Sequence, residues 1–358
     1  MKETLKKYSK RYLIDAMGSM ALGLFASLLI GTIFNTLGMI PGLSSLTTIG
    51  KTAQSVAGPA MAIAIALSLK ASPLVVFSTA AVGALANSLG GAGGPLAVLV
   101  IAIIATEIGM LVSKKTKVDI LVTPFVTILV GGLLSIWFAP YIGKAVGVFT
   151  AIISFAMTRQ PFVMGLLVSC VVGIALTLPI SSAAICAALG LSAVSAAAMA
   201  DPEIATGLAM AGGAAVAGCC AHMIGFAVMS FKENGVGGLV SQGIGTSMLQ
   251  MPNLVKNPRL WIPPVLTSMI TGPLATCVFN MQMYGEAINS GMGTCGLLGP
   301  LGIILGWFGG KYPTAVGVWD WVGLALVCFI LPAVLTPIFC EILRKIGWVK
   351  DGDLKLPE

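Results

Sequence analysis

The stretch PLVVFSTAAVGALANSLGGAGGPLAVLVIAIIATEIGMLV (73–112) consists of two long apolar runs separated by the glycine-rich sequence GGAGGP (90–95). A membrane-spanning helix needs about 20 mostly apolar residues, so each run approaches the length of one crossing. Glycine and proline clusters interrupt helices. The stretch therefore predicts two helices, about 73–90 and 95–113, joined by a turn.

The same apolar character extends over nearly the whole chain, from about Leu13 to Leu343. The composition is 57% hydrophobic and 9% charged, and the mean hydropathy is +0.99. Few soluble domains tolerate that balance, so lipid must be the solvent for most of the surface. We predict an all-α polytopic membrane protein with about ten transmembrane helices. The predicted helices are about 13–39, 52–69, 73–90, 95–113, 120–142, 143–158, 162–180, 203–231, 259–281 and 315–343.

Two further segments, 179–202 and 285–306, are apolar but interrupted by glycine or proline. Such segments often form a transporter's binding site, so we predict re-entrant hairpins there, with short tilted helices as the alternative. The predicted organisation is a cytosolic head (1–12), a first helical half (13–160), a second half with the re-entrant segments and the substrate site (161–343), and a cytosolic tail (344–358).

Positive charges predict the orientation. The net charge is +7, and the lysines and arginines cluster at the ends of apolar runs without interleaved aromatic residues. This distribution favours the positive-inside rule over binding to nucleic acid. The head, the tail and the basic loop KKTKVD (114–119) all fall on one side if ten helices cross the membrane. We therefore expect a multi-pass protein of the cell membrane with both termini in the cytosol.

Polar residues inside apolar runs are candidates for function. Glu107 lies in the fourth predicted helix, either as a functional carboxylate or extending towards nearby Lys114 and Lys115 at the membrane edge. His222, the single histidine, is either a packed core residue or a contact for substrate or a proton. Asn87 and Asn280 could bind substrate or bridge helices.

The richest polar segment is FKENGVGGLVSQGIGTSMLQMPN (231–253), which contains Glu233, Asn234 and Gln242. Amides and hydroxyls supply both donors and acceptors, as the hydroxyl groups of a sugar require. The alternative interpretation is a plain cytosolic loop.

Several classes of site have no motif here. There is no phosphate-binding GxxxxGK[ST] sequence, no HExxH and no GxSxG. The eight cysteines include no CxxC pair and no metal-ligand spacing with the histidine, so buried free thiols are expected. We predict no catalytic residues, no metal and no cofactor.

The chain resembles the EIIC membrane component of the sugar phosphotransferase system (PTS), in its branch related to the perfringolysin regulator. The stretches that carry the resemblance are GAGGP (91–95), TKVDILVTP (116–124), LTLPISSAA (176–184), HMIGFAVMSFKENG (222–235), GIGTSMLQMPNLVKNP (243–258), WIPPVLTSMITGPLAT (261–276) and GMGTCGLLGP (291–300). The resemblance implies a homodimer whose subunits combine a scaffold with a mobile substrate domain. It also implies that a sugar is accepted outside and phosphorylated at the cytosolic face by a separate EIIB protein.

One departure concerns the GITE-like motif of glucose-type EIIC proteins, whose glutamate contacts sugar. The nearest match, IATE (104–107), lies in the first half of the chain, so that role is not transferred to Glu107. The leading hypothesis is a sugar permease that works by alternating access and binds sugar through His222, Glu233, Asn234, Gln242 and Asn280. The alternatives are a ligand-sensing regulator that does not transport, and a proton- or ion-coupled carrier that uses Glu107 and His222.

Overall fold

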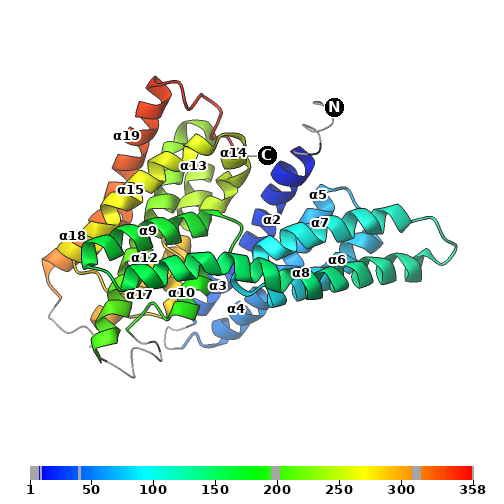
Figure 1. Ribbon diagram of the computed structural model, residues 1–358, viewed down its shortest axis with the longest axis horizontal. Coiled ribbons are helices and arrows are strands. Elements are labelled where there is room, and N and C mark those ends of the chain that lie inside the picture. The colour runs from blue at the N-terminus through cyan, green and yellow to red at the C-terminus, as the bar shows by residue number, and fades with distance from the viewer. Residues whose placement is uncertain are drawn as a thin grey trace. The chain divides into compact units, whose positions relative to one another are not determined.

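The computed structural model describes residues 8, 10–38, 42–193, 195, 202–308 and 316–356, and these residues form helices with no β-strand (Figure 1). Six helical segments within these ranges are long and apolar enough to cross a membrane: Lys10–Asn35, Pro73–Val112, Asp119–Met157, Ile204–Met229, Pro258–Val278 and Val318–Lys345. Shorter apolar helices are Ala57–Ser68, Pro161–Thr177 and Cys295–Phe308. The predicted all-α polytopic membrane protein is confirmed.

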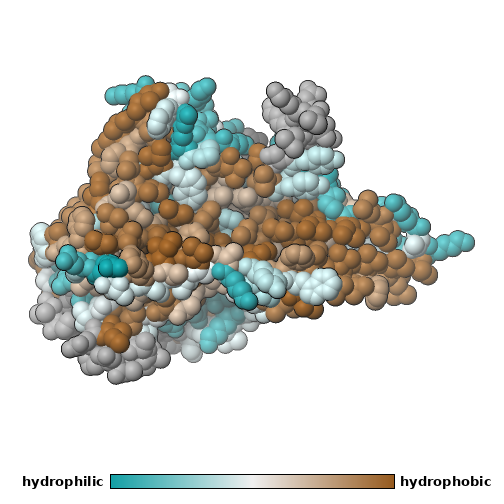
Figure 2. Space-filling model, viewed as in Figure 1, coloured by the Kyte–Doolittle hydropathy of each residue, from teal (hydrophilic) through white to brown (hydrophobic). Residues whose placement is uncertain are grey.

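The surface fits this assignment. Figure 2 shows apolar residues over much of the visible face, while hydrophilic residues gather at the loop that precedes Asp119. Large exposed side chains such as Phe77, Phe125 and Trp137 are apolar. Exposed apolar area on this scale is compatible with a lipid environment and not with water.

The described part of the chain divides into two compact units, one within residues 8–146 and the other within residues 147–356. In the first unit, η1 (Lys10–Asp15), α2 (Ala16–Leu24), η2 (Phe25–Leu29) and α3 (Ile30–Leu37) follow without interruption, and α4 (Ser45–Ser55), α5 (Ala57–Ser68), α6 (Pro73–Gly90), η3 (Gly91–Gly93) and α7 (Gly94–Val112) come next. α6 packs on both α5 and α7. The predicted turn is confirmed, since Gly91 has a φ of +52° and η3 connects α6 to α7.

Helix α8 (Asp119–Met157) differs from its prediction. Two helices, 120–142 and 143–158, were predicted, but α8 is continuous, so the predicted break is wrong. The glycine at the expected break instead permits close packing: a Cβ on Gly143 would lie 2.6 Å from the carbonyl oxygen of Gly90. At 1.5 Å per residue α8 is about 58 Å long, roughly twice the ~30 Å thickness of a hydrocarbon core.

The second unit is built around α12 (Pro202–Met229), which packs against α9 (Pro161–Thr177), α15 (Ile262–Pro273) and α19 (Leu331–Lys345). Its central residues are small and fully buried, which lets neighbouring backbones approach. The remaining elements are α10 (Ser182–Leu189), α13 (Phe231–Val240), η4 (Ser241–Gly245), η5 (Ser247–Gln250), α14 (Met251–Lys256), η6 (Pro258–Trp261), η7 (Leu274–Val278), α16 (Ala287–Ser290), η8 (Cys295–Leu297), α17 (Leu298–Phe308), α18 (Val318–Ala325) and η9 (Leu326–Ile330).

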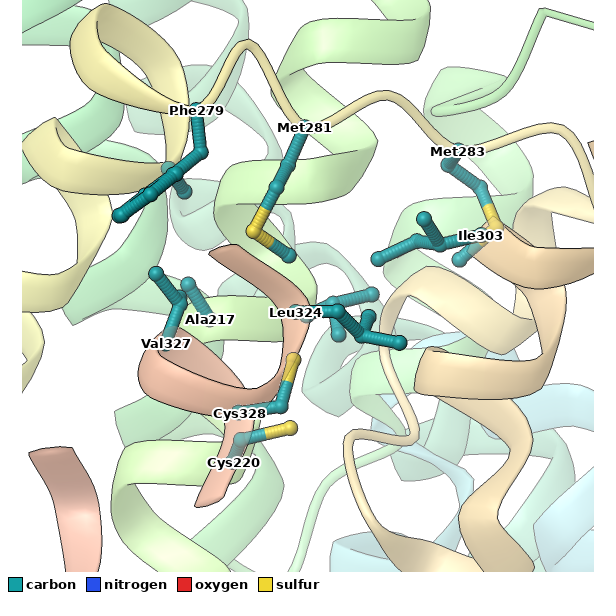
Figure 3. Close-up of a cluster of buried hydrophobic side chains, with 11 residues drawn as sticks. Ala217, Cys220, Phe279, Met281, Met283, Ile303, Leu324, Val327 and Cys328 are labelled. Carbon is teal, nitrogen blue, oxygen red and sulfur yellow. The ribbon is translucent and has the colours of Figure 1, made fainter. Parts of the chain in front are cut away.

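Figure 3 shows the apolar core beside α12. Ala217 and Cys220 of α12 face Val327 and Cys328 of η9, with Met281 from the segment after η7 above them. Methionine fills irregular spaces between small residues, so this cluster accommodates the π-helical turn η9 within the segment Val318–Lys345. The core fixes α12 as the central element of the unit.

Both predicted re-entrant segments contain short helices. In the first, α10 has eight residues; in the second, α16 has four and α17 has eleven. The two segments are joined by hydrogen bonds, including Ser182 Oγ to the Gly291 carbonyl (2.7 Å) and Ser290 Oγ to the Leu191 carbonyl (2.6 Å). Residues 194 and 196–201 of the first segment lie outside the described residues. That either segment turns back within a bilayer stays a prediction.

Candidate functional site

His222 lies in the C-terminal third of α12 with no exposed surface. Its Nδ1 is 3.0 Å from the Thr177 hydroxyl, which is itself 2.8 Å from the Ser247 hydroxyl. The other ring nitrogen, Nε2, has no hydrogen-bond partner among the described residues. An unsatisfied buried polar group costs about 1–3 kcal/mol, so this nitrogen has a free capacity to bind a ligand.

Local sequence shapes the backbone at each of these three side chains. α9 ends at Thr177 because Leu178 precedes Pro179, and a residue before proline avoids the helical conformation. Gly173, one turn earlier, allows α12 to approach: a Cβ there would lie 2.6 Å from Cδ2 of His222. Ser247 begins η5, and the Thr246 side chain accepts a hydrogen bond from the amide of Met248. We call His222, Thr177 and Ser247 the histidine cluster.

Interrupted backbone surrounds the histidine cluster. The Thr294 hydroxyl donates to the carbonyl of Gly243 in η4 at 2.5 Å. Gly293, with a φ of +53°, lies against Cys219 and Cys220, so close that a Cβ would be 2.5 Å from the Cβ of Cys219. Broken helices whose ends meet within a bundle are the usual setting of transporter binding sites, because they expose backbone groups to a ligand.

Two aromatic rings flank His222. The ring centroid of Trp261 is 5.9 Å away and that of Phe226 is 6.1 Å away. A few polar groups among aromatic and apolar walls are the usual lining of a small-molecule site.

A second polar group adjoins the cluster. The Gln250 amide donates to Gln242 Oε1 at 2.9 Å, and the Gln242 amide donates to Ser230 Oγ at 2.9 Å. The Asn253 amide donates to Gln250 Oε1 at 2.8 Å. We call Gln242, Gln250 and Asn253 the amide group. All three side chains are buried, so this part of the 231–253 segment is not the plain loop offered as the alternative.

Comparison with known proteins identifies the family. The family model described as "Phosphotransferase system, EIIC" matches residues 14–356. The chain belongs to the EIIC family of the phosphotransferase system. No curated protein and no solved structure matches it. As an EIIC component with long apolar helices, it is a multi-pass membrane permease component of that system.

Two of the predicted site residues of this EIIC protein lie beside the amide group. Glu233 forms an ion pair with Arg344 of α19, at 2.5 Å between Oε1 and Nη2, with side-chain exposures of 9% and 12%. The Asn234 amide donates to the Leu354 carbonyl at 2.8 Å. The structure therefore brings Glu233, Asn234 and Gln242 together, and all three have partners within the protein. Sugar binding by these residues stays a prediction.

The remaining candidates lie elsewhere. Asn280 is exposed after η7 with a φ of +50°, a conformation that asparagine adopts more readily than most residues at helix ends. In the first unit, Glu107 accepts from Arg11 at 2.6 Å and from the Tyr12 hydroxyl at 3.0 Å. Asn87 of α6 is half-buried, and its Cβ packs close to Gly58 of α5. Substrate contacts by these residues also stay predictions.

Sequence reasoning missed Thr177, Arg344 and the role of Ser247. The sequence held a signal for Thr177: it is a polar residue directly before LPISS, where proline and serines interrupt an apolar run. The sequence held no such signal for Arg344, because an arginine at the start of the basic tail is explained by membrane orientation alone. Its partner Glu233 is 111 residues away in sequence.

Proposed function

We propose that this EIIC protein binds a sugar at the histidine cluster and carries it across the membrane by alternating access, after which a separate EIIB protein phosphorylates it. The observation that carries the proposal is the unpartnered Nε2 of His222, buried where interrupted helices meet in a chain of the EIIC family. The histidine cluster is thus the first candidate for the sugar site, ahead of Glu233, Asn234, Gln242, Asn280, Asn87 and Glu107.

The chemistry of the cluster suits a hydroxyl-rich ligand. A neutral imidazole has one donor and one acceptor nitrogen, and a hydroxyl both donates and accepts. Thr177 occupies Nδ1 and leaves Nε2 to a sugar hydroxyl, which can donate to that nitrogen or accept from it. Ser247 holds Thr177 from the other side. The histidine would thereby be fixed in orientation before the ligand arrives.

Phosphorylation of the transported sugar would require the EIIB protein, which binds at the cytosolic face. The exposed loop between α7 and α8 carries Lys114, Lys115 and Lys117, whose charge would attract an anionic, phosphorylated EIIB surface. The alternative is that these lysines only set the orientation of the protein in the membrane. The proposal includes the cytosolic location of both termini, the scaffold and substrate halves of 13–160 and 161–343, and a homodimer.

The first experiment is a binding screen of the purified protein against sugars and other small metabolites, followed by variants. His222→Ala and Thr177→Val should each weaken binding of the ligand found. The matched control is Thr271→Val, which alters a buried threonine of α15 whose hydroxyl donates to the Thr267 carbonyl. Equal binding by His222→Ala and the wild type would contradict the site.

The second experiment separates transport from sensing. Reconstituted protein should move unmodified sugar, and phosphorylated sugar should appear only when an EIIB protein is added. Binding without movement, with or without EIIB, would favour the ligand-sensing regulator. Movement driven by a proton gradient, and lost in Glu107→Gln, would favour the ion-coupled carrier.

A further inference from the structure

The C-terminal tail, residues 346–356, is bound along the second unit by side chains of the 230–257 segment. Figure 1 shows it running from α19 back beside α13 and α14. Leu354 has no exposed surface, and its carbonyl accepts from both Asn234 Nδ2 (2.8 Å) and Gln250 Nε2 (3.0 Å). The Leu356 amide donates to Asn234 Oδ1 at 2.8 Å. The tail therefore has a defined register.

Further contacts extend this binding in both directions. The side-chain amide of Asn253 donates to the Lys355 carbonyl at 2.8 Å. The Asn257 amide donates to the Trp348 carbonyl at 3.0 Å, and the Arg259 guanidinium lies 4.9 Å from the centre of the Trp348 ring. The asparagine and glutamine side chains act here as hydrogen-bond partners for a tail that is folded into successive turns.

Element η5 connects the tail to the histidine cluster. Its first residue, Ser247, contacts Thr177, and its last residue, Gln250, contacts the Leu354 carbonyl. A 3₁₀ helix of four residues advances about 2 Å per residue, so the two contacts are separated by one short, hydrogen-bonded turn. The contact to the tail and the contact to the histidine cluster therefore lie at the two ends of one short element.

We propose that the tail positions η5 so that Ser247 completes the hydrogen-bond chain to His222, which makes Gln250 and Leu354 positioning residues for the ligand site. The proposal rests on the proposed function, since the histidine cluster is taken as the sugar site. Release of the tail would let η5 shift and alter the orientation of His222, so a partner that captured the tail would change ligand affinity from outside the site.

The single histidine of the chain permits a direct test without a ligand. Protein labelled with ¹⁵N-histidine, purified by a tag without histidine, gives only the imidazole signals of His222. Leu354→Asp should release the tail, and Gln250→Leu should break the link while keeping a buried side chain. Both variants should shift the Nδ1 signal. The control Lys350→Ala changes an exposed tail side chain and should leave the signal unchanged.

Tail release is measured independently, as trypsin cleavage after Lys350 detected by mass spectrometry. Leu354→Ala serves if the aspartate variant does not fold. A tail that is cleaved freely while the His222 signals match the wild type would overturn the proposal. So would a Gln250→Leu spectrum identical to the wild type.

Ligand affinity provides a second readout. Both variants should bind the sugar about three- to tenfold more weakly, the effect of losing one hydrogen bond at the site. Wild-type protein that binds no sugar contradicts the proposed function whatever the spectra show. Unchanged His222 signals contradict the positioning role even when sugar binds.

Discussion

The ion pair between Glu233 and Arg344 predicts how two substitutions change stability, because the two residues differ in their other partners. Arg344 also pairs with the exposed Asp351, whereas Glu233 Oε2 has no partner among the described residues. Removing Arg344 therefore leaves an unpaired buried carboxylate. Removing the charge of Glu233 leaves a guanidinium that keeps one partner.

The magnitudes follow from burial. With exposures of 9% and 12%, the pair is close to a buried salt bridge. Loss of one partner of such a pair costs about 3–5 kcal/mol, which we expect for Arg344→Met. For Glu233→Gln we expect about 1–3 kcal/mol, the cost of a weakened charged hydrogen bond. The double variant should cost less than the sum, by about 0.5–3 kcal/mol.

The assay is thermal unfolding in detergent, followed by a thiol-reactive dye that reports exposure of the buried cysteines. For a folding unit of the size of residues 147–356, each 1 kcal/mol shifts the midpoint by about 2–4 °C, so Arg344→Met should lower it by at least about 6 °C. Midpoints are compared at one heating rate because unfolding of such proteins is often irreversible.

Matched controls lie in the same helix. Glu341 and Lys345 are exposed, so Glu341→Gln and Lys345→Met should change stability by no more than about 0.5 kcal/mol. The reasoning is refuted if Arg344→Met unfolds at the same midpoint temperature as these controls. It is also refuted if Glu233→Gln lowers the midpoint more than Arg344→Met does.

Four other outcomes are expected. A single cysteine at Thr116, in a background without native cysteines, should resist impermeant thiol reagents in intact cells; ready labelling from outside would contradict the cytosolic loop. Replacing the three lysines of the 114–119 loop by glutamine should slow EIIB-dependent phosphorylation, and an unchanged rate with preserved orientation would leave them only a topological role. Gly173→Ala should weaken ligand binding because its methyl group would displace the His222 ring, whereas Gly207→Ala, which has open space around it, should not. Asn280→Gly should be tolerated and Asn280→Ala should cost about 1 kcal/mol of stability if the left-handed turn is the main role of Asn280; weaker ligand binding by a stably folded Asn280→Gly would instead favour a substrate contact.

The sequence by itself determined the environment and the helical architecture. An apolar excess over most of the chain requires lipid, and a chain in lipid must satisfy its backbone hydrogen bonds internally, which for these runs means helices. Proline and glycine then set several boundaries that the structure reproduces, such as those of α6, η3 and α7. These features depend on residues near one another in the chain.

Only the tertiary structure decided whether α8 breaks and which polar groups pair. A glycine at position 143 is compatible with a break in the helix or with close helix packing. Gly90 lies against Gly143 in the structure, so the glycine serves close packing. His222 and Ser247 lie 45 and 70 residues from Thr177, and the tail binds side-chain amides that lie 91 or more residues earlier. A side chain's hydrogen-bonding capacity is visible in the sequence, but its partner depends on how helices pack, and that is a property of the whole fold.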